Sequence, residues 1–120
     1  MAVAAAAAVS YVAAVDPNEP GHYPGCPVLS LTGFFCPGCG TLRALHALAH
    51  GDLVAAAGLN IMTVFAVVGL AVIWVQWARR RWLGRPRTST APPARLWALL
   101  AVVVAFTVVR NLPPGAVLAP

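Results

Sequence analysis

The chain has 120 residues, of which 60% are hydrophobic and only 9% are charged, and its formal net charge is +5. A mean hydropathy of +0.79 is higher than a soluble domain of this size normally has, so the composition predicts a single integral membrane domain, residues 1–120. A basic chain can also bind nucleic acid. Here, however, six of the eight basic residues lie in the one loop that follows an apolar segment, as juxtamembrane arginines do, which favours the lipid bilayer as partner over nucleic acid.

The first apolar segment, residues 2–15, is short for a membrane span. Its 14 residues rise about 21 Å as a helix, against a hydrocarbon core of about 30 Å. A cleaved signal peptide is the alternative. A signal peptide has a positively charged residue before its apolar run, however, and no Lys or Arg precedes the run here. We therefore expect residues 2–15 to form the first of three transmembrane helices.

Residues 16–52 are expected to form a loop that contains all of the cysteines, histidines and acidic residues. An amphipathic helix of about three turns is expected to begin with Thr41 as its N-cap. The polar residues of one face are Arg43, His46 and His50. Gly51 is expected to end this helix and Asp52 to cap the next one. Such a helix is expected to lie in the membrane interface.

The second and third spans are predicted at residues 53–78 and 96–112, each a long apolar run with few polar residues. Asn60 lies about eight residues into the second span, where an amide facing lipid is costly. We therefore expect Asn60 to point at another helix or at the underside of the motif loop. Arg110 lies near the end of the third span and is expected to snorkel to the interface. The spans also offer faces to a membrane-protein partner.

Orientation follows from the loop 79–95, which holds six arginines and is therefore predicted to be cytoplasmic. With three spans, the N-terminus is then cytoplasmic, and both the motif loop 16–52 and the C-terminus are extracytoplasmic. All basic residues are arginine, a bias typical of GC-rich bacterial genomes. The expected location is therefore the bacterial inner membrane, with a multi-pass topology.

The turn "CPGCG" predicts a metal site. It resembles the knuckle of zinc ribbons, in which Cys36 and Cys39 would supply two thiolates, and Gly40 permits the positive φ that follows. Two ligands do not make a tetrahedral site, but the upstream stretch "HYPGC" supplies more. The candidate ligands are Cys26, Cys36, Cys39 and His22, with His46 as an alternative to His22. Zinc and copper(I) both suit such a set.

Two other chemistries remain open for the same cysteines. Three cysteines on an oxidising face allow one disulfide, between Cys26 and either Cys36 or Cys39, that would staple the outer loop. A Cys-Pro-x-Cys pair before a helix N-terminus, with Arg43 nearby, also has the electropositive setting that lowers a thiol pKa. That setting favours a thiol–disulfide oxidoreductase that uses Cys36 and Cys39.

The run "YPGCPVLSLTGFFCPGCGTLRALHALAHGDLVAAAGLN" resembles a family of small bacterial membrane proteins known as a domain of unknown function and marked by the CPxCGxxRA motif. The matching positions are Cys26, Pro27, Thr32, Gly33, Cys36, Pro37, Cys39, Gly40, Arg43, Ala44, Gly51 and Asn60. The resemblance covers residues 23–60. It implies a few membrane spans around the motif and no particular activity.

The sequence thus predicts an all-α membrane protein with an extracytoplasmic cysteine knuckle that binds metal or is stapled by a disulfide. An accessory or structural role is favoured over an enzyme, because there is no Ser-His-Asp set and only three acidic residues are present for acid/base chemistry. The alternatives are a membrane oxidoreductase that uses Cys36 and Cys39, and a subunit that handles a transition metal.

Overall fold

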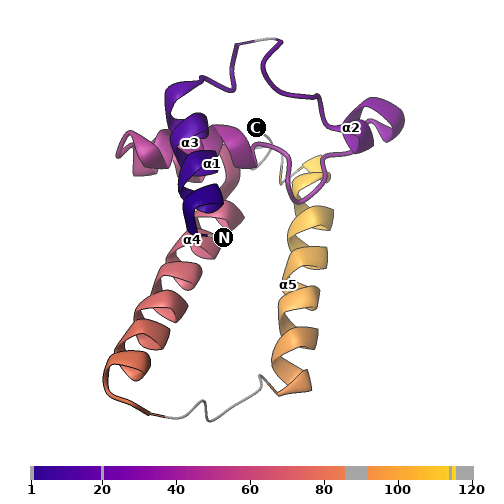
Figure 1. The fold of residues 1–120 in the computed structure, drawn as a ribbon. Helices are drawn as coiled ribbons and strands as arrows, with labels where there is room; N and C mark the ends of the chain where they lie inside the picture. Colours follow the sequence, from indigo (N-terminus) through magenta and orange to yellow (C-terminus); the bar gives the residue numbers. More distant parts are fainter. Residues whose placement is uncertain (1, 20, 86–91, 114, 116–120) are drawn as a thin grey trace.

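The computed structural model describes residues 2–19, 21–85, 92–113 and 115, and these residues form helices joined by loops, without strands (Figure 1). The helices are α1 (Ala2–Ala14), α2 (Pro27–Thr32), α3 (Thr41–Ala49), α4 (Leu53–Trp82) and α5 (Pro93–Arg110). The two long helices, α4 and α5, run side by side but apart, and α1, α2 and α3 lie at one shared end of the pair. The protein is therefore all-helical, as the sequence predicts.

Helices α4 and α5 are the two that are long and apolar enough to cross a membrane among the residues described. They correspond to the second and third predicted spans. The first predicted span is not confirmed, because α1 has 13 residues and rises only about 20 Å, less than the hydrocarbon core of about 30 Å. Helix α1 instead packs against α3, where the carbonyl of Val12 accepts a hydrogen bond from His46 Nδ1 at 2.8 Å.

Helix α4 is broken at Asn60, whose φ of −163° and ψ of 96° are extended rather than helical. The Asn60 Oδ1 atom accepts a hydrogen bond of 3.2 Å from the amide of Thr63, so Asn60 caps the helical part that follows it. That part, residues 61–82, rises about 33 Å, which matches the thickness of the hydrocarbon core. The regular helical part of α4 after Asn60 is therefore by itself long enough to cross a membrane.

The boundary between α3 and α4 confirms two predictions and corrects one. Gly51 follows α3 with a φ of 79°, and Asp52 caps α4 by accepting a hydrogen bond of 2.9 Å from the Ala55 amide. The prediction that Thr41 caps α3 is wrong, because Gly40 is the N-cap and Thr41 is the first helical residue. Gly40 has a φ of 81°, a conformation that glycine adopts without the steric cost of a Cβ atom.

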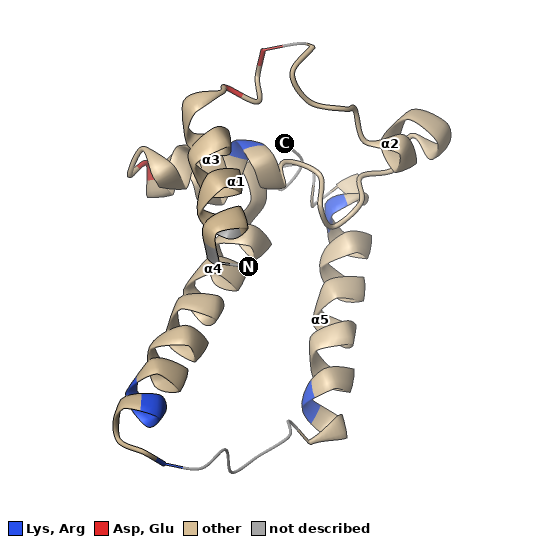
Figure 2. Ribbon diagram, viewed as in Figure 1, with Lys and Arg blue, Asp and Glu red and all other residues tan. Residues whose placement is uncertain are grey.

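The charged residues divide between the two ends of the helix pair (Figure 2). The arginines at the end away from α3 are Arg79, Arg80, Arg81, Arg85 and Arg95. The three acidic residues of the chain lie at the other end, with the cysteine-containing loop. Helices α4 and α5 do not contact each other over the described residues. At the end near α3, the loop that precedes α3 lies between them and bonds to both.

Candidate metal centre

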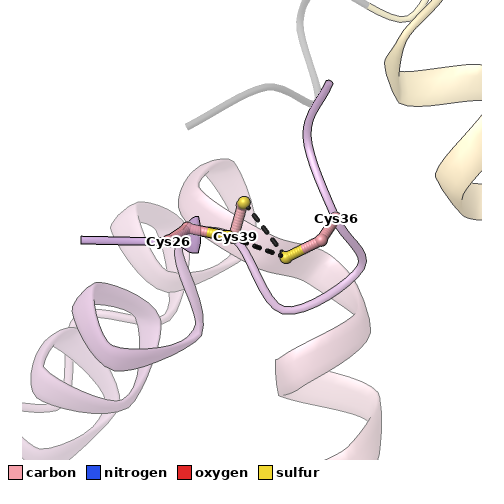
Figure 3. A group of neighbouring side chains, drawn as sticks. All are labelled: Cys26, Cys36 and Cys39. Atoms are coloured by element: carbon pink, nitrogen blue, oxygen red, sulfur yellow. Dashed lines mark hydrogen bonds between the residues drawn. The ribbon is translucent and has the colours of Figure 1, made fainter. Parts of the chain in front are cut away.

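Three cysteine side chains meet between the start of α2 and the turn that precedes α3. Cys26 is the residue before α2, and Cys36 and Cys39 belong to the turn before α3. The sulfur of Cys26 lies 3.4 Å from that of Cys36, which lies 3.2 Å from that of Cys39 (Figure 3). All three sulfur atoms are within 4.8 Å of one another, so the structure joins a distant cysteine to the Cys-x-x-Cys turn.

The sulfur separations suit a shared metal ion. A disulfide bond measures about 2.05 Å, so sulfurs 3.2 and 3.4 Å apart belong to three separate thiols, and the outer loop is not stapled by a disulfide in this structure. Two thiolates bound to one tetrahedral zinc at about 2.3 Å are about 3.8 Å apart. The two printed separations are a few tenths of an ångström shorter than that spacing, and all three sulfurs lie within 4.8 Å of one another.

The turn itself places Cys36 and Cys39. The Cys39 amide donates a hydrogen bond of 3.1 Å to the Cys36 carbonyl, and the Thr41 amide donates one of 3.0 Å to the Gly38 carbonyl. These two bonds close consecutive turns over "CPGCGT", which puts both sulfurs on one side of the loop. Cys39 is buried, whereas Cys26 and Cys36 are half-buried, so the cluster lies at the edge of the folded part and not deep within it.

Asn60 holds this turn from the side of α4. Its Nδ2 atom donates hydrogen bonds of 3.0 Å to the carbonyls of Pro37 and Cys39. The side chain is only 1% exposed. The structure thus confirms that Asn60 points at the underside of the motif loop, and it explains the break in α4: the extended backbone of Asn60 directs the amide toward the turn while its Oδ1 caps the rest of the helix.

Arg110 holds the same turn from α5, and the prediction that it snorkels to the interface is wrong. The side chain is 1% exposed, and its guanidinium donates to the Cys36 carbonyl at 3.1 Å and to the Cys39 carbonyl at 3.3 Å. It also lies 5.7 Å from the ring centroid of Phe35 and 5.0 Å from that of Phe106. The backbone carbonyls of the turn accept hydrogen bonds from the charged guanidinium inside the protein, so the Arg110 side chain turns inward.

Asn111 is a second contact from α5 that the sequence reasoning missed. Its Oδ1 accepts a hydrogen bond of 2.8 Å from the Phe35 amide, and its Nδ2 donates one of 2.8 Å to the Phe35 carbonyl. The available signal was the polar pair of Arg110 and Asn111 at the end of an otherwise apolar run. Together these residues fix the backbone on both sides of Cys36.

The three thiols differ in their electrostatic environment. The amide of Leu29 at the start of α2 lowers the pKa of the Cys26 thiol to about 7, and the thiols of Cys36 and Cys39 contribute to the same effect. Burial, followed by the neighbouring sulfurs of Cys36 and Cys26, raises the pKa of Cys39 to about 12. Cys26 therefore ionises at a lower pH than Cys39.

The histidines of the predicted ligand set lie outside the cluster of sulfurs. His22 is exposed and has no ligand atom within the three-cysteine group. His46 also lies outside the cluster. Because a carbonyl can only accept, the His46 Nδ1 atom carries the hydrogen of the bond to the Val12 carbonyl. The centroid of the His46 ring lies 4.4 Å from that of His50, with the two ring planes tilted by 40°. Ligation by either histidine stays a prediction. Arg43 is exposed and makes no ion pair with any residue in the described part of the chain.

The match to known families falls on the segment that builds this site. Residues 26–74 match DUF2752, a family of proteins of unknown function. The match begins at Cys26 and includes Cys36, Cys39 and Asn60, whereas Arg110 lies outside it. The predicted resemblance to a family of unknown function is thereby confirmed. Comparison of the chain with curated proteins and with solved structures found no match.

A pocket of about 510 Å³ opens beside the cysteines of the DUF2752 segment. Cys26 and Cys39 both line it, and so do two residues of opposite charge, Glu19 and Arg43. The other lining residues are a mixture of polar and apolar ones, with Tyr23 and Phe35 among them. A ligand in this pocket would therefore lie beside two of the three cysteines.

Proposed function

We propose that this protein holds a soft transition-metal ion, zinc or copper(I), on the thiolates of Cys26, Cys36 and Cys39. The observation that carries the proposal is the convergence of three sulfur atoms within 4.8 Å of one another from two segments of the chain. Thiolate is the ligand that selects zinc and copper(I) over magnesium, calcium and manganese. A tetrahedral zinc takes three such ligands and one more, whereas copper(I) is also satisfied by three.

The charge of the surroundings supports a thiolate site. Three thiolates around a divalent zinc carry a net charge of −1, which is costly to hold near the membrane without compensation. Arg110 lies against the backbone of Cys36 and Cys39, where its positive charge is well placed to offset that of the metal–thiolate group. Asn60 fixes the same backbone from α4, so both membrane-spanning helices would pre-position the ligands.

We further propose that the metal site faces the extracytoplasmic side of a bacterial inner membrane. The arginines of the loop 79–95 support a cytoplasmic location for that loop, and the cysteines lie at the opposite end of α4 and α5. The packing of α1 against α3 supports placing α1 on the cysteine side and not across the membrane. The role that fits is an accessory protein that holds or passes a metal, with no catalytic step of its own.

The metal content and thiol count of the purified full chain test this proposal. Close to one zinc or copper per chain is expected, with all three thiols protected from alkylation until a chelator is added. Cys26→Ser is expected to lower the bound metal as strongly as Cys39→Ser, since both supply one of three ligands. Ser30→Ala is a matched control, because the Ser30 hydroxyl bonds to the Pro27 carbonyl within α2, and its amide bond to the Cys26 carbonyl is kept in the variant. Metal-free protein with three freely reactive thiols contradicts the proposal.

Thiol–disulfide exchange is a second candidate, supported by the lowered pKa of Cys26. The Cys26 thiolate would attack a partner's disulfide, and Cys36, 3.4 Å away, would then displace the partner's second thiol. The two cysteines would be oxidised to a disulfide while the partner is reduced to a dithiol. In this case the reactive pair is Cys26 and Cys36, and a protein without metal is expected to cycle between dithiol and disulfide forms.

A further inference from the structure

We infer that the pocket beside the cysteines binds a small thiol that carries both an ammonium and a carboxylate group, and that the sulfur of this thiol is the fourth ligand of the metal. The inference deepens the proposed function and rests on it, with zinc as the resident ion. It assigns the pocket a ligand class, a low-molecular-weight amino-acid thiol.

A tetrahedral zinc has four positions, and the chain brings three sulfurs to one point. No histidine, aspartate or glutamate of the described residues joins that group. A zinc with three protein ligands keeps an open position for an exogenous ligand, which is the arrangement of exchangeable and not of structural sites.

Cys26 and Cys39 line the pocket of about 510 Å³, so a molecule in it lies next to two of the three ligands. The volume lies within the range of small-molecule binding sites, about 300–1,000 Å³. Each of these cysteines comes from a different segment, and the pocket therefore opens where the two segments meet around the metal.

Glu19 and Arg43 are the charged residues among the pocket's described lining, and neither side chain forms an ion pair or a hydrogen bond with another described residue. An arginine offers a fork of donors to a carboxylate, and a glutamate accepts from an ammonium group. A ligand that carries both groups satisfies both side chains, whereas a purely anionic ligand would approach Glu19 and the negatively charged metal–thiolate group.

The binding step is an exchange of ligands without electron transfer. The exogenous thiol loses its proton to solvent, its thiolate forms a bond to zinc, and a water molecule leaves the fourth position. Binding should therefore release one proton for each thiol taken up.

The full chain in detergent, loaded with Co²⁺ in place of zinc, tests the inference through its thiolate-to-cobalt charge-transfer absorption. Four probes are titrated: L-cysteine, cysteamine without the carboxylate, 3-mercaptopropionate without the ammonium group, and neutral 2-mercaptoethanol. Each added thiolate should raise the absorption per cobalt. L-Cysteine is expected to bind tightest, because it alone carries both charged groups.

Two variants test the two charged residues of the pocket separately, and neither removes a metal ligand. Arg43→Gln is expected to weaken L-cysteine and 3-mercaptopropionate about two- to fivefold, the usual range for an accessible ion pair, and to leave cysteamine unchanged. Glu19→Gln is expected to weaken L-cysteine and cysteamine and to strengthen 3-mercaptopropionate. Cobalt affinity without added thiol should stay the same in both variants.

The failures are distinguishable. If the chain binds no Co²⁺, the zinc form of the proposed function fails and the inference with it. If Co²⁺ binds but no thiol changes its spectrum, or if His22→Ala lowers cobalt affinity because the chain supplies its own fourth ligand, the metal site stands and the inference is overturned. Equal binding of all four thiols, unaffected by either variant, also overturns it.

Discussion

Asn60→Leu removes the contact through which α4 holds the cysteine turn. The substitution keeps the approximate volume of the side chain but deletes two hydrogen bonds of 3.0 Å, to the carbonyls of Pro37 and Cys39, and the 3.2 Å bond that caps residues 61–82. Each of the first two is worth about 1 kcal/mol net, and the cap contributes about 1 kcal/mol more. The Cys39 carbonyl keeps its bonds to Arg110, so no large penalty for an unsatisfied group is added there.

The expected loss of stability is therefore about 3 kcal/mol, measured as a lower midpoint of denaturant unfolding of the full chain in detergent. Local opening of the turn should also speed alkylation of Cys39, by up to a hundredfold, since about 1.4 kcal/mol corresponds to a factor of ten. Thiol alkylation followed by mass spectrometry measures this rate. An increase confined to cysteines of the turn would locate the damage at the contact with Asn60.

Thr63→Val is the matched control. Thr63 lies one turn away on α4 and its hydroxyl bonds to the Thr41 hydroxyl at 3.1 Å, without touching a cysteine carbonyl. It should cost about 1 kcal/mol and leave the alkylation rate nearly unchanged. The reasoning is refuted if Asn60→Leu unfolds at the same midpoint as the unaltered chain with the same cysteine reactivity, or if Thr63→Val exposes Cys39 equally.

Three further predictions concern the ends of the helices and the thiols. Arg110→Met is expected to raise the alkylation rate of Cys36 several-fold in metal-free protein, whereas Arg95→Met, at the other end of α5, should leave it unchanged. Because the pKa of Cys26 is lowered to about 7, its thiolate is lost only as the pH falls through that value. Alkylation of Cys26 should therefore slow about tenfold between about pH 8 and about pH 6, whereas alkylation of an ordinary thiol slows about 75-fold over the same range. Reporter fusions should place the chain after Arg85 in the cytoplasm and Glu19 outside; the reverse pattern would overturn the proposed orientation.

Local patterns in the sequence account for most of the helical framework. Long apolar runs identify α4 and α5, and the short-range signals at Gly51 and Asp52 mark where α3 ends and α4 begins, because each depends on neighbours within a few residues. The short length of the first apolar segment was also visible. What the sequence did not indicate is that this segment packs on α3 through Val12 and His46, a contact between residues 34 apart.

At the cysteine site, too, local sequence signals predict some contacts and miss others. The burial cost of an amide in an apolar helix was enough to predict that Asn60 turns toward the motif loop, although not that the helix breaks there. For Arg110 the same reasoning failed. Snorkelling is the usual solution for an arginine near a helix end, and nothing within several residues of Arg110 shows that carbonyls 74 and 71 positions earlier will meet it. Such acceptors exist only once the chain has folded.

X-ray absorption of the zinc-loaded full chain tests the central claim most directly, because it counts the ligand atoms around the metal. The account predicts at least three sulfur atoms at about 2.3 Å from each zinc, falling by one in Cys26→Ser. A first shell made of nitrogen and oxygen alone, or one with two sulfurs that Cys26→Ser leaves unchanged, would contradict it.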